Sequence, residues 1–513
     1  MKNKIILIAL CLTGIAISCK KEISPVLEYN SFTYSSKDQD AGTWTSIYLT
    51  SASQVAVAAP TDPTSSEYLS ELAALKSLSA SLSSDQEKKV KYWGTNGVIR
   101  WNEIARELVA KYFTLPQPNE DGSYSWPSST DPSTYPLYPF SSPPYASRTY
   151  AYLSAGNFDA MIATWYYKFQ YNRNAPSTYD ASIVTHLPIQ DLPAYPSEDA
   201  VLAGFSRTLL TFLFPLEESY LTTLAGEQES SRLWAGTNVQ SDLSAGDSLG
   251  AKIAKLFITR GKGDGMKNTL GNQAVWDSIN HVWEATGKAI WKSLEAPGRQ
   301  MLAPKFGLVK PWSFTTSDVT TTYRLPAPPE VGSAEFQTAL DEVMDYCKHA
   351  NRDEQQIAFK WDDGTRTYGP PGHWNWIAEP YITNAQYSPL RAARVLAYMN
   401  MAIEDAGICV WDNKFHYFFP RPTNVNADIK TLMGVPNFPS YPSGHSGFSG
   451  AAATVLAHFF PSYAGTFTTL ANEAAMSRLY GCIHYRFDCD AGVTLGNQVG
   501  LAAINHAIVD GGE

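Results

Sequence analysis

The chain repeats itself at a separation of 246 residues, and this repeat limits the possible folds more than any other feature. Arg148 and Tyr152 reappear as Arg394 and Tyr398 at that separation. Without a gap, the same shift pairs residues 195–197 with 441–443 (Tyr-Pro-Ser), 214–215 with 460–461 (Phe-Pro) and 222–225 with 468–471 (Thr-Thr-Leu-Ala). One register held over about a hundred residues predicts a duplicated structural unit.

The dominant pattern in both copies is that of amphipathic helices, while strand-like alternation is rare. We expect helices at residues 98–113, 336–348, 389–411, 446–460, 467–484 and 491–509. Segments rich in Pro, Ser and Tyr, 116–145 and 296–333, are expected to be irregular. The predicted fold is therefore all-α, with two duplicated helical bundles related by an approximate two-fold axis.

The N-terminus has the features of an export signal. Lys2 and Lys4 precede an apolar run at residues 5–17, which is too short to span a bilayer. The sequence Ala-Ile-Ser-Cys at 16–19 looks like a bacterial lipobox, with Cys19 as the lipidated residue. We expect a signal peptide at 1–18 and an exported outer-membrane lipoprotein, periplasmic or at the cell surface. Plain secretion with a free Cys19 is the alternative.

Composition limits the partners. The chain has 513 residues with 49 Asp and Glu against 39 Lys and Arg, which argues against nucleic acid or an anionic membrane held by bulk charge. We expect membrane contact only through the lipid anchor. The predicted organisation is an N-terminal bundle half at 19–295, a Pro-rich connection at 296–335 and a C-terminal half at 336–513. Export permits disulfides, and the sequence leaves the state of Cys347, Cys409, Cys482 and Cys489 open.

Three cations in the second copy form one candidate site. Lys414, Arg421 and Arg478 stand out in a chain with only 17% charged residues. If they converge, they can hold a tetrahedral or trigonal-bipyramidal oxyanion such as phosphate. Ser443 and Gly444 precede a predicted helix, whose N-terminal N–H groups would add neutral donors for the same anion.

Two histidines complete the candidate site. His484 and Asp488 are four residues apart, so we expect them to share one face of a helix. A carboxylate that binds one imidazole nitrogen makes the other more nucleophilic, as attack on phosphorus requires. His445 follows the predicted anion-binding turn and is placed to act as acid and base.

These elements resemble the signature of the type 2 phosphatidic acid phosphatase and vanadium-dependent haloperoxidase superfamily, over residues 414–488. The duplication and length resemble its large haloperoxidase-related branch. The resemblance implies an all-α fold and an oxyanion site. Its oxyanion ligands would be Lys414, Arg421, Ser443, Gly444 and Arg478, with His445 as acid and base and His484 as nucleophile. In haloperoxidases the residue that matches His484 is instead the apical ligand of vanadate.

The signature does not separate the two activities. Our first expectation is a phosphoester hydrolase that forms a phosphohistidine, takes a small anionic phosphoester and needs no cofactor. The short spacing from His445 to Ser477 favours it. The alternative is a haloperoxidase that binds vanadate and uses halide and peroxide, which the length and duplication favour. A third reading is a non-catalytic oxyanion-binding lipoprotein.

The first copy lacks several of these residues. Lys168, Ser197, Arg232 and Asp242 match their counterparts. Four positions differ: Ala175 replaces Arg421, Glu198 replaces Gly444, Asp199 replaces His445 and Asn238 replaces His484. We expect the two added carboxylates to repel an oxyanion. The N-terminal half is therefore predicted to have no catalytic function and to support the other half.

Overall fold

The computed structural model describes residues 30–114, 119–121, 123, 141–296 and 298–513, and these form helices and connecting segments without a strand. The main helices of the N-terminal part are α2 (Ser66–Ser79), α3 (Ser84–Trp93), α4 (Gly97–Tyr112), α5 (Pro143–Tyr171), α6 (Pro176–Tyr179), α7 (Glu198–Leu213), α8 (Glu218–Trp234), α9 (Gln240–Gly263) and α10 (Gln273–Glu284). Those of the C-terminal part are α11 (Thr316–Thr320), α12 (Ala334–His349), α13 (Arg352–Lys360), α14 (Gly369–Asn384), α15 (Pro389–Tyr417), α16 (Pro422–Val425), α17 (Gly444–Phe459), α18 (Ala464–Tyr480) and α19 (Arg486–Ala507). The all-α prediction is confirmed.

The repeat of the sequence is also a repeat of helices. The helices α5, α6, α7 and α8 start 246 residues before α15, α16, α17 and α18, as α9 does before α19. The two long helices α5 and α15 each end in a residue with left-handed backbone, Asn172 and Phe418. Both copies also carry a cis peptide bond just before the helix α7 or α17, at Tyr195-Pro196 and Tyr441-Pro442. The local backbone of the two candidate sites is therefore the same.

The repeat extends further toward the N-terminus than the sequence register shows. Helices α2 and α3 precede α12 and α13 by 268 residues instead of 246. Their roles match: Trp93 and Trp361, at the ends of α3 and α13, donate their indole N–H to Glu227 and Glu473. Glu227 and Glu473 are again 246 residues apart. The longer connection between α4 and α5 shifts the register, which hid this part of the repeat.

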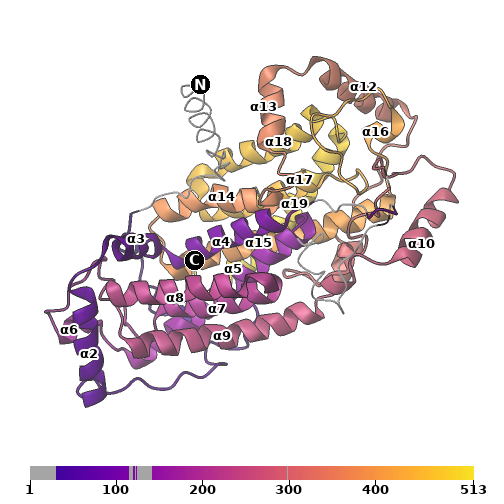
Figure 1. Cartoon of the computed structure of the whole chain (residues 1–513). Helices are drawn as coiled ribbons and strands as arrows, with labels where there is room; N and C mark the ends of the chain where they lie inside the picture. Colours follow the sequence, from indigo (N-terminus) through magenta and orange to yellow (C-terminus); the bar gives the residue numbers. More distant parts are fainter. Residues whose placement is uncertain (1–29, 115–118, 122, 124–140, 297) are drawn as a thin grey trace, which may run out of the picture.

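The two bundles meet along α5 and α15, which pack against each other in the middle of the molecule (Figure 1). A buried polar network crosses this contact. Asn400 of α15 donates to Ser154 of α5 at 2.9 Å and exchanges hydrogen bonds with Asn375 of α14, which accepts from Asn102 of α4 at 2.8 Å. Buried amides need such partners, so this network fixes how the halves are aligned.

Several predicted helices in the C-terminal half have other bounds in the structure. The segment 467–484 is not one helix, because α18 ends at Tyr480 and Cys482 has a φ of +60°. The next helix begins at Arg486 instead of 491. His484 therefore lies in a turn, and it does not share a helix face with Asp488 as the spacing suggested. The segment 446–460 forms α17, which starts two residues earlier, at Gly444.

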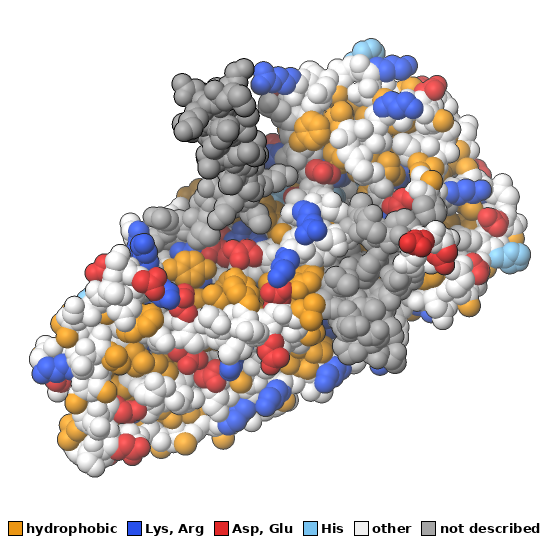
Figure 2. Space-filling model, viewed as in Figure 1, with side chains coloured by type: hydrophobic (Ala, Val, Ile, Leu, Met, Phe, Trp, Pro, Cys, Tyr) orange, Lys and Arg blue, Asp and Glu red, His pale blue; other side chains and the backbone are white. Residues whose placement is uncertain are grey.

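The signal peptide and Cys19 lie outside the described residues, so export and lipidation stay predictions. Among the described helices, none combines the length and apolar character needed to cross a membrane. Acidic and basic side chains are interspersed over the face shown in Figure 2. The domain boundaries predicted above also stay a prediction.

Candidate active site

Lys414 anchors the candidate site in the last turn of α15. Its ammonium donates to the carbonyl oxygens of Pro439, Ser440 and Pro442 at 2.8, 2.7 and 2.6 Å. The side chain is fully buried. These three hydrogen bonds hold the loop that leads into α17. Lys414 therefore fixes the conformation of this loop and also places its ammonium group beside it.

The two arginines reach the same place from other elements. Arg421, which precedes α16, donates through Nε to the Phe438 carbonyl at 3.0 Å and through one amino group to the Ile483 carbonyl at 2.8 Å. That amino group lies 3.3 Å from His484 Nε2. Its other amino group is buried and has no hydrogen-bond partner in the described part of the chain. A donor without a partner in a buried site is costly, and an oxyanion would satisfy it.

Arg478 lies near the end of α18, and hydrogen bonds to Ser477 and Trp361 fix its side chain. Its Nε donates to Ser477 Oγ at 2.9 Å, and one amino group donates to the Trp361 carbonyl. It is 1% exposed. The Trp361 ring stacks on His373, whose Nδ1 lies 3.1 Å from Asp363. The position of Arg478 therefore depends on the loop between α13 and α14.

Ser443 and Gly444 start α17. Ser443 is the N-cap, and its hydroxyl accepts from the Ser446 N–H at 3.4 Å. The first N–H groups of a helix have no partner within it, so they remain available to an anion. His445 follows directly, and its Nε2 is buried without a hydrogen-bond partner.

The candidate nucleophile is oriented by a carboxylate. His484 Nδ1 lies 2.9 Å from Asp488 Oδ2, which also accepts from Ser440 Oγ at 2.5 Å and from the Tyr485 N–H at 3.1 Å. Asp488 is the third residue of α19, and it caps that helix. This contact assigns the proton to Nδ1 and leaves the Nε2 lone pair for a reacting atom.

Crowded, buried positive charge sets the titration of this cluster. Burial, followed by the charge of Arg421, lowers the pKa of Lys414 well below its usual value. Burial lowers the pKa of Arg421 to about 9 and that of Arg478 to about 10. The pKa of His484 is lowered by burial and then by Arg421 and Lys414. An anion bound among these groups would favour their charged forms.

The residues present therefore fit a tetrahedral oxyanion, either phosphate or vanadate. Lys414 and Arg421 lie near Asp488, Arg478 lies near Asp363 and Asp362, and the free donors include one Arg421 amino group. His484 Nε2 lies 3.3 Å from Arg421. Such a cluster can bind an oxyanion and present an imidazole to its central atom.

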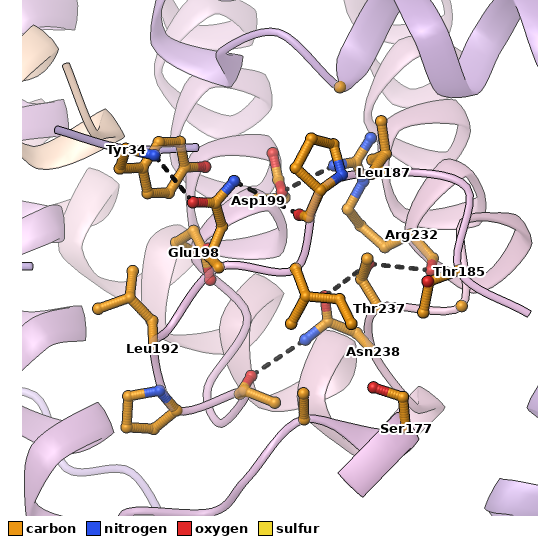
Figure 3. Close-up of a pocket in the computed structure, with 18 of the residues that line it drawn as sticks. Tyr34, Ser177, Thr185, Leu187, Leu192, Glu198, Asp199, Arg232, Thr237 and Asn238 are labelled. Carbon is orange, nitrogen blue, oxygen red and sulfur yellow. Dashed lines mark hydrogen bonds and ion pairs between the residues drawn. The ribbon is translucent and has the colours of Figure 1, made fainter. Parts of the chain in front are cut away.

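The equivalent place in the N-terminal half is a different pocket, shown in Figure 3. Lys168 pairs with Glu198 at 2.7 Å, and Arg232 pairs with Asp199 at 3.2 Å. The Asn238 amide donates to the Ala194 carbonyl at 3.0 Å. The added carboxylates do more than repel an oxyanion, because they themselves neutralise the cations that would bind it.

One cation near this pocket, outside its lining, was missed from the sequence. Ala175 stands at the register position of Arg421, which suggested a lost charge, but Arg173 takes its place and pairs with Asp242. Arg173 comes only two residues before the expected position. An ungapped comparison of the two copies does not detect a shift of two residues in a loop. The structure nevertheless places a guanidinium beside Asp242, the counterpart of Asp488.

Two residues of the C-terminal site were also missed. Ser440 donates to Asp488, and its counterpart in the first copy is Ala194. Phe438 lies under both Lys414 and Arg421, with each cation 5.2 Å from the ring centre. The comparison of Ser440 with Ala194 was available in the sequence, whereas the position of Phe438 depends on the loop conformation.

Comparison with known proteins supports the resemblance. Residues 394–507 match the family model described as PAP2 superfamily, which spans α15 to α19 and every candidate residue. The search of curated proteins found no match.

Solved structures with a similar fold are vanadium haloperoxidases. A bacterial vanadium-dependent iodoperoxidase has 22% identity and a TM-score of 0.59, with 80% of this chain and 95% of that chain covered. A bacterial vanadium-dependent chloroperoxidase, in its holo form, has 15% identity and a TM-score of 0.53, with 75% and 96% covered. These similarities and the family match confirm the superfamily resemblance and the haloperoxidase-like fold.

Proposed function

We propose that this protein is an enzyme of the haloperoxidase type, with vanadate held in the C-terminal pocket and hydrogen peroxide and a halide as substrates. The observation that carries the proposal is the burial of the pocket. Lys414, Arg421 and Ser443 are fully buried, and Arg478 and His484 are 1% and 2% exposed. Small reactants fit such a site better than a phosphoester with a bulky organic group.

The similar structures support this choice. Each is described as a vanadium-dependent peroxidase, and the similarity extends over 95% or more of its chain, including both halves. The sequence favoured phosphoester hydrolysis first, on the short spacing from His445 to Ser477. The burial of the pocket reverses that preference.

The side chains that would hold vanadate are Lys414, Arg421, Arg478 and Ser443, with the N–H of Gly444, and His484 Nε2 would bind it. When bound, vanadate activates peroxide toward oxidation of a halide. Asp488 keeps the proton of His484 on Nδ1, so that Nε2 is free to bind. The buried cations Lys414, Arg421 and Arg478 would neutralise the charge of the oxyanion.

His445 is the proton carrier of the proposed reaction. Burial and the charge of Arg478 lower its pKa well below the usual value, which favours the neutral imidazole. Its Nε2 is buried and has no hydrogen-bond partner among the described residues. A neutral imidazole at this position can accept a proton from an entering peroxide and release it again.

A phosphoester hydrolase is the second candidate, and the His484–Asp488 contact favours it. The same Nε2 can attack phosphorus, with His445 giving a proton to the leaving oxygen. One experiment separates the two. The purified chain is given vanadate, peroxide and iodide or bromide with a halogenation reporter, and in parallel a chromogenic phosphomonoester without vanadate. Halogenation that requires vanadate supports the proposal, whereas phosphatase activity alone supports the second candidate.

A further inference from the structure

Two cysteines from distant parts of the chain lie close together beside the candidate site. Cys347 is near the end of α12, and Cys482 is in the turn between α18 and α19. Both border the segment 430–432. The Lys430 N–H donates to Cys347 Sγ at 3.1 Å, and the Leu432 N–H donates to the Gly481 carbonyl at 3.4 Å.

A ring contact next to the two cysteines also brings the end of α12 close to the end of α18. The rings of Tyr346 and Tyr480, next to the cysteines in sequence, meet edge to face with centres 5.0 Å apart. Cys347 Sγ donates to the Lys430 carbonyl at 3.4 Å, and Cys482 Sγ donates to the Tyr480 carbonyl at 3.6 Å, so both thiols lie at the ends of this tyrosine contact. Burial, followed by the nearby Cys347, raises the pKa of Cys482 to about 12. Both cysteines are reduced in the structure.

In the N-terminal half, the counterparts of the two cysteines are other residues. The residue 246 positions before Cys482 is Gly236, with a φ of +71°, and Cys482 has a φ of +60°. Left-handed backbone favours glycine and is unfavourable for a side chain such as that of cysteine. The residue 268 positions before Cys347 is Ser79. The C-terminal half thus has a cysteine where the same turn is better served by glycine.

We propose that Cys347 and Cys482 form a disulfide under oxidising conditions, linking α12 to the turn that carries His484. Cys347 is the partly exposed member and reacts first. Its thiol reacts with hydrogen peroxide to give a sulfenic acid and water, and the Cys482 thiol then attacks that sulfur and releases a second water. Overall, two thiols lose two protons and two electrons to one peroxide, which becomes two waters.

The bond would act on the position of His484, which lies two residues after Cys482. One hydrogen bond, from the Leu432 N–H to the Gly481 carbonyl at 3.4 Å, joins the turn to the segment 430–432, and it is long for its kind. A covalent link to α12 restricts the turn in the folded state and the chain in the unfolded state. The inference does not depend on which reaction the pocket performs.

The test uses the full chain, reduced and then treated with one equivalent of hydrogen peroxide. Free thiols are alkylated, and digestion products are examined by mass spectrometry without reduction. We expect a loss of 2 Da and a peptide pair joining Cys347 to Cys482, while Cys409 and Cys489, both buried, remain alkylated. The oxidised chain should melt about 2–5 °C higher than the reduced chain.

Matched variants come from the other half of the molecule. Cys347→Ser and Cys482→Gly install the residues found at Ser79 and Gly236, so the turn should still fold. Neither variant should lose 2 Da. The proposal is overturned if peroxide leaves the wild-type thiols unchanged or drives Cys347 to sulfinic acid without a cross-link, if Cys347 joins another cysteine, or if the −2 Da species persists in Cys482→Gly.

Discussion

The two halves of the molecule present the same helices around two pockets of opposite character. In the N-terminal half, Lys168, Arg173 and Arg232 form ion pairs with Glu198, Asp242 and Asp199. In the C-terminal half, Lys414 and Arg421 lie near Asp488, and the acidic neighbours of Arg478 are Asp363 and Asp362. The difference is one of charge compensation: each cation of the first half is paired with a carboxylate, whereas no such ion pair to Lys414, Arg421 or Arg478 is found among the described residues.

The two halves share their backbone features and differ in a few side chains around the candidate site. Both copies keep the cis peptide bond, the long helix with its terminal lysine and the capping acid of the last helix. Two neighbouring residues at the start of α7 and α17 decide whether the cations are neutralised. The following predictions change those residues, or the imidazole beside them.

The largest effect is expected for His484→Ala. This variant removes both the candidate nucleophile and the candidate apical ligand, so halogenation or phosphoester hydrolysis should fall at least about 1,000-fold. Asn238→Ala, the matched change in the other half, should leave activity unchanged. Steady-state rates on both purified variants make the comparison, and an active His484→Ala enzyme would refute the assigned role.

A smaller but still large effect is expected for Gly444→Glu, which copies Glu198. A Cβ at residue 444 would meet only Trp411 and Phe448 atoms at ordinary contact distances, the nearest at 3.5 Å. The new carboxylate should pair with Lys414, as Glu198 pairs with Lys168, and repel an oxyanion. Vanadate or phosphate affinity, measured by calorimetry, should fall about 100-fold. Unchanged affinity would show that Lys414 does not face the anion.

Much of this arrangement followed from the sequence. The repeat predicted the duplicated bundles, and the residue types predicted the three cations and the histidine–carboxylate pair. Arg173 and Phe438 were beyond reach, because their positions depend on loop paths that leave no periodic pattern. The helix break at Cys482 was missed because the apolar period continues through the turn, and a cysteine gives no signal for left-handed backbone.

An intermediate effect is expected for Ser440→Ala, which copies Ala194. The variant removes the hydroxyl that donates to Asp488 at 2.5 Å. The carboxylate then orients His484 less firmly, and turnover should fall about 10-fold. A structural role alone would lower the melting temperature and leave the pH–rate profile unchanged, so both are measured. A profile identical to that of the wild type would contradict the positioning role.

The smallest effect is expected for the double variant Glu198→Gly with Asp199→His. It removes the carboxylates that neutralise Lys168 and Arg232, and it places a histidine where His445 stands in the other half. A second, weak phosphate site should appear, without added activity, because Asn238 still occupies the nucleophile position. Titration calorimetry would detect it, and no change in stoichiometry would mean that the first pocket is closed for another reason.

The most direct test of the account is the number of oxyanions bound per chain. Calorimetric titration of the wild-type protein with vanadate should give one site, which Gly444→Glu weakens strongly and Asn238→Ala leaves intact. Two sites per chain, or one site that survives Gly444→Glu and is lost in Asn238→Ala, would contradict the claim that uncompensated positive charge in the C-terminal half makes the active site.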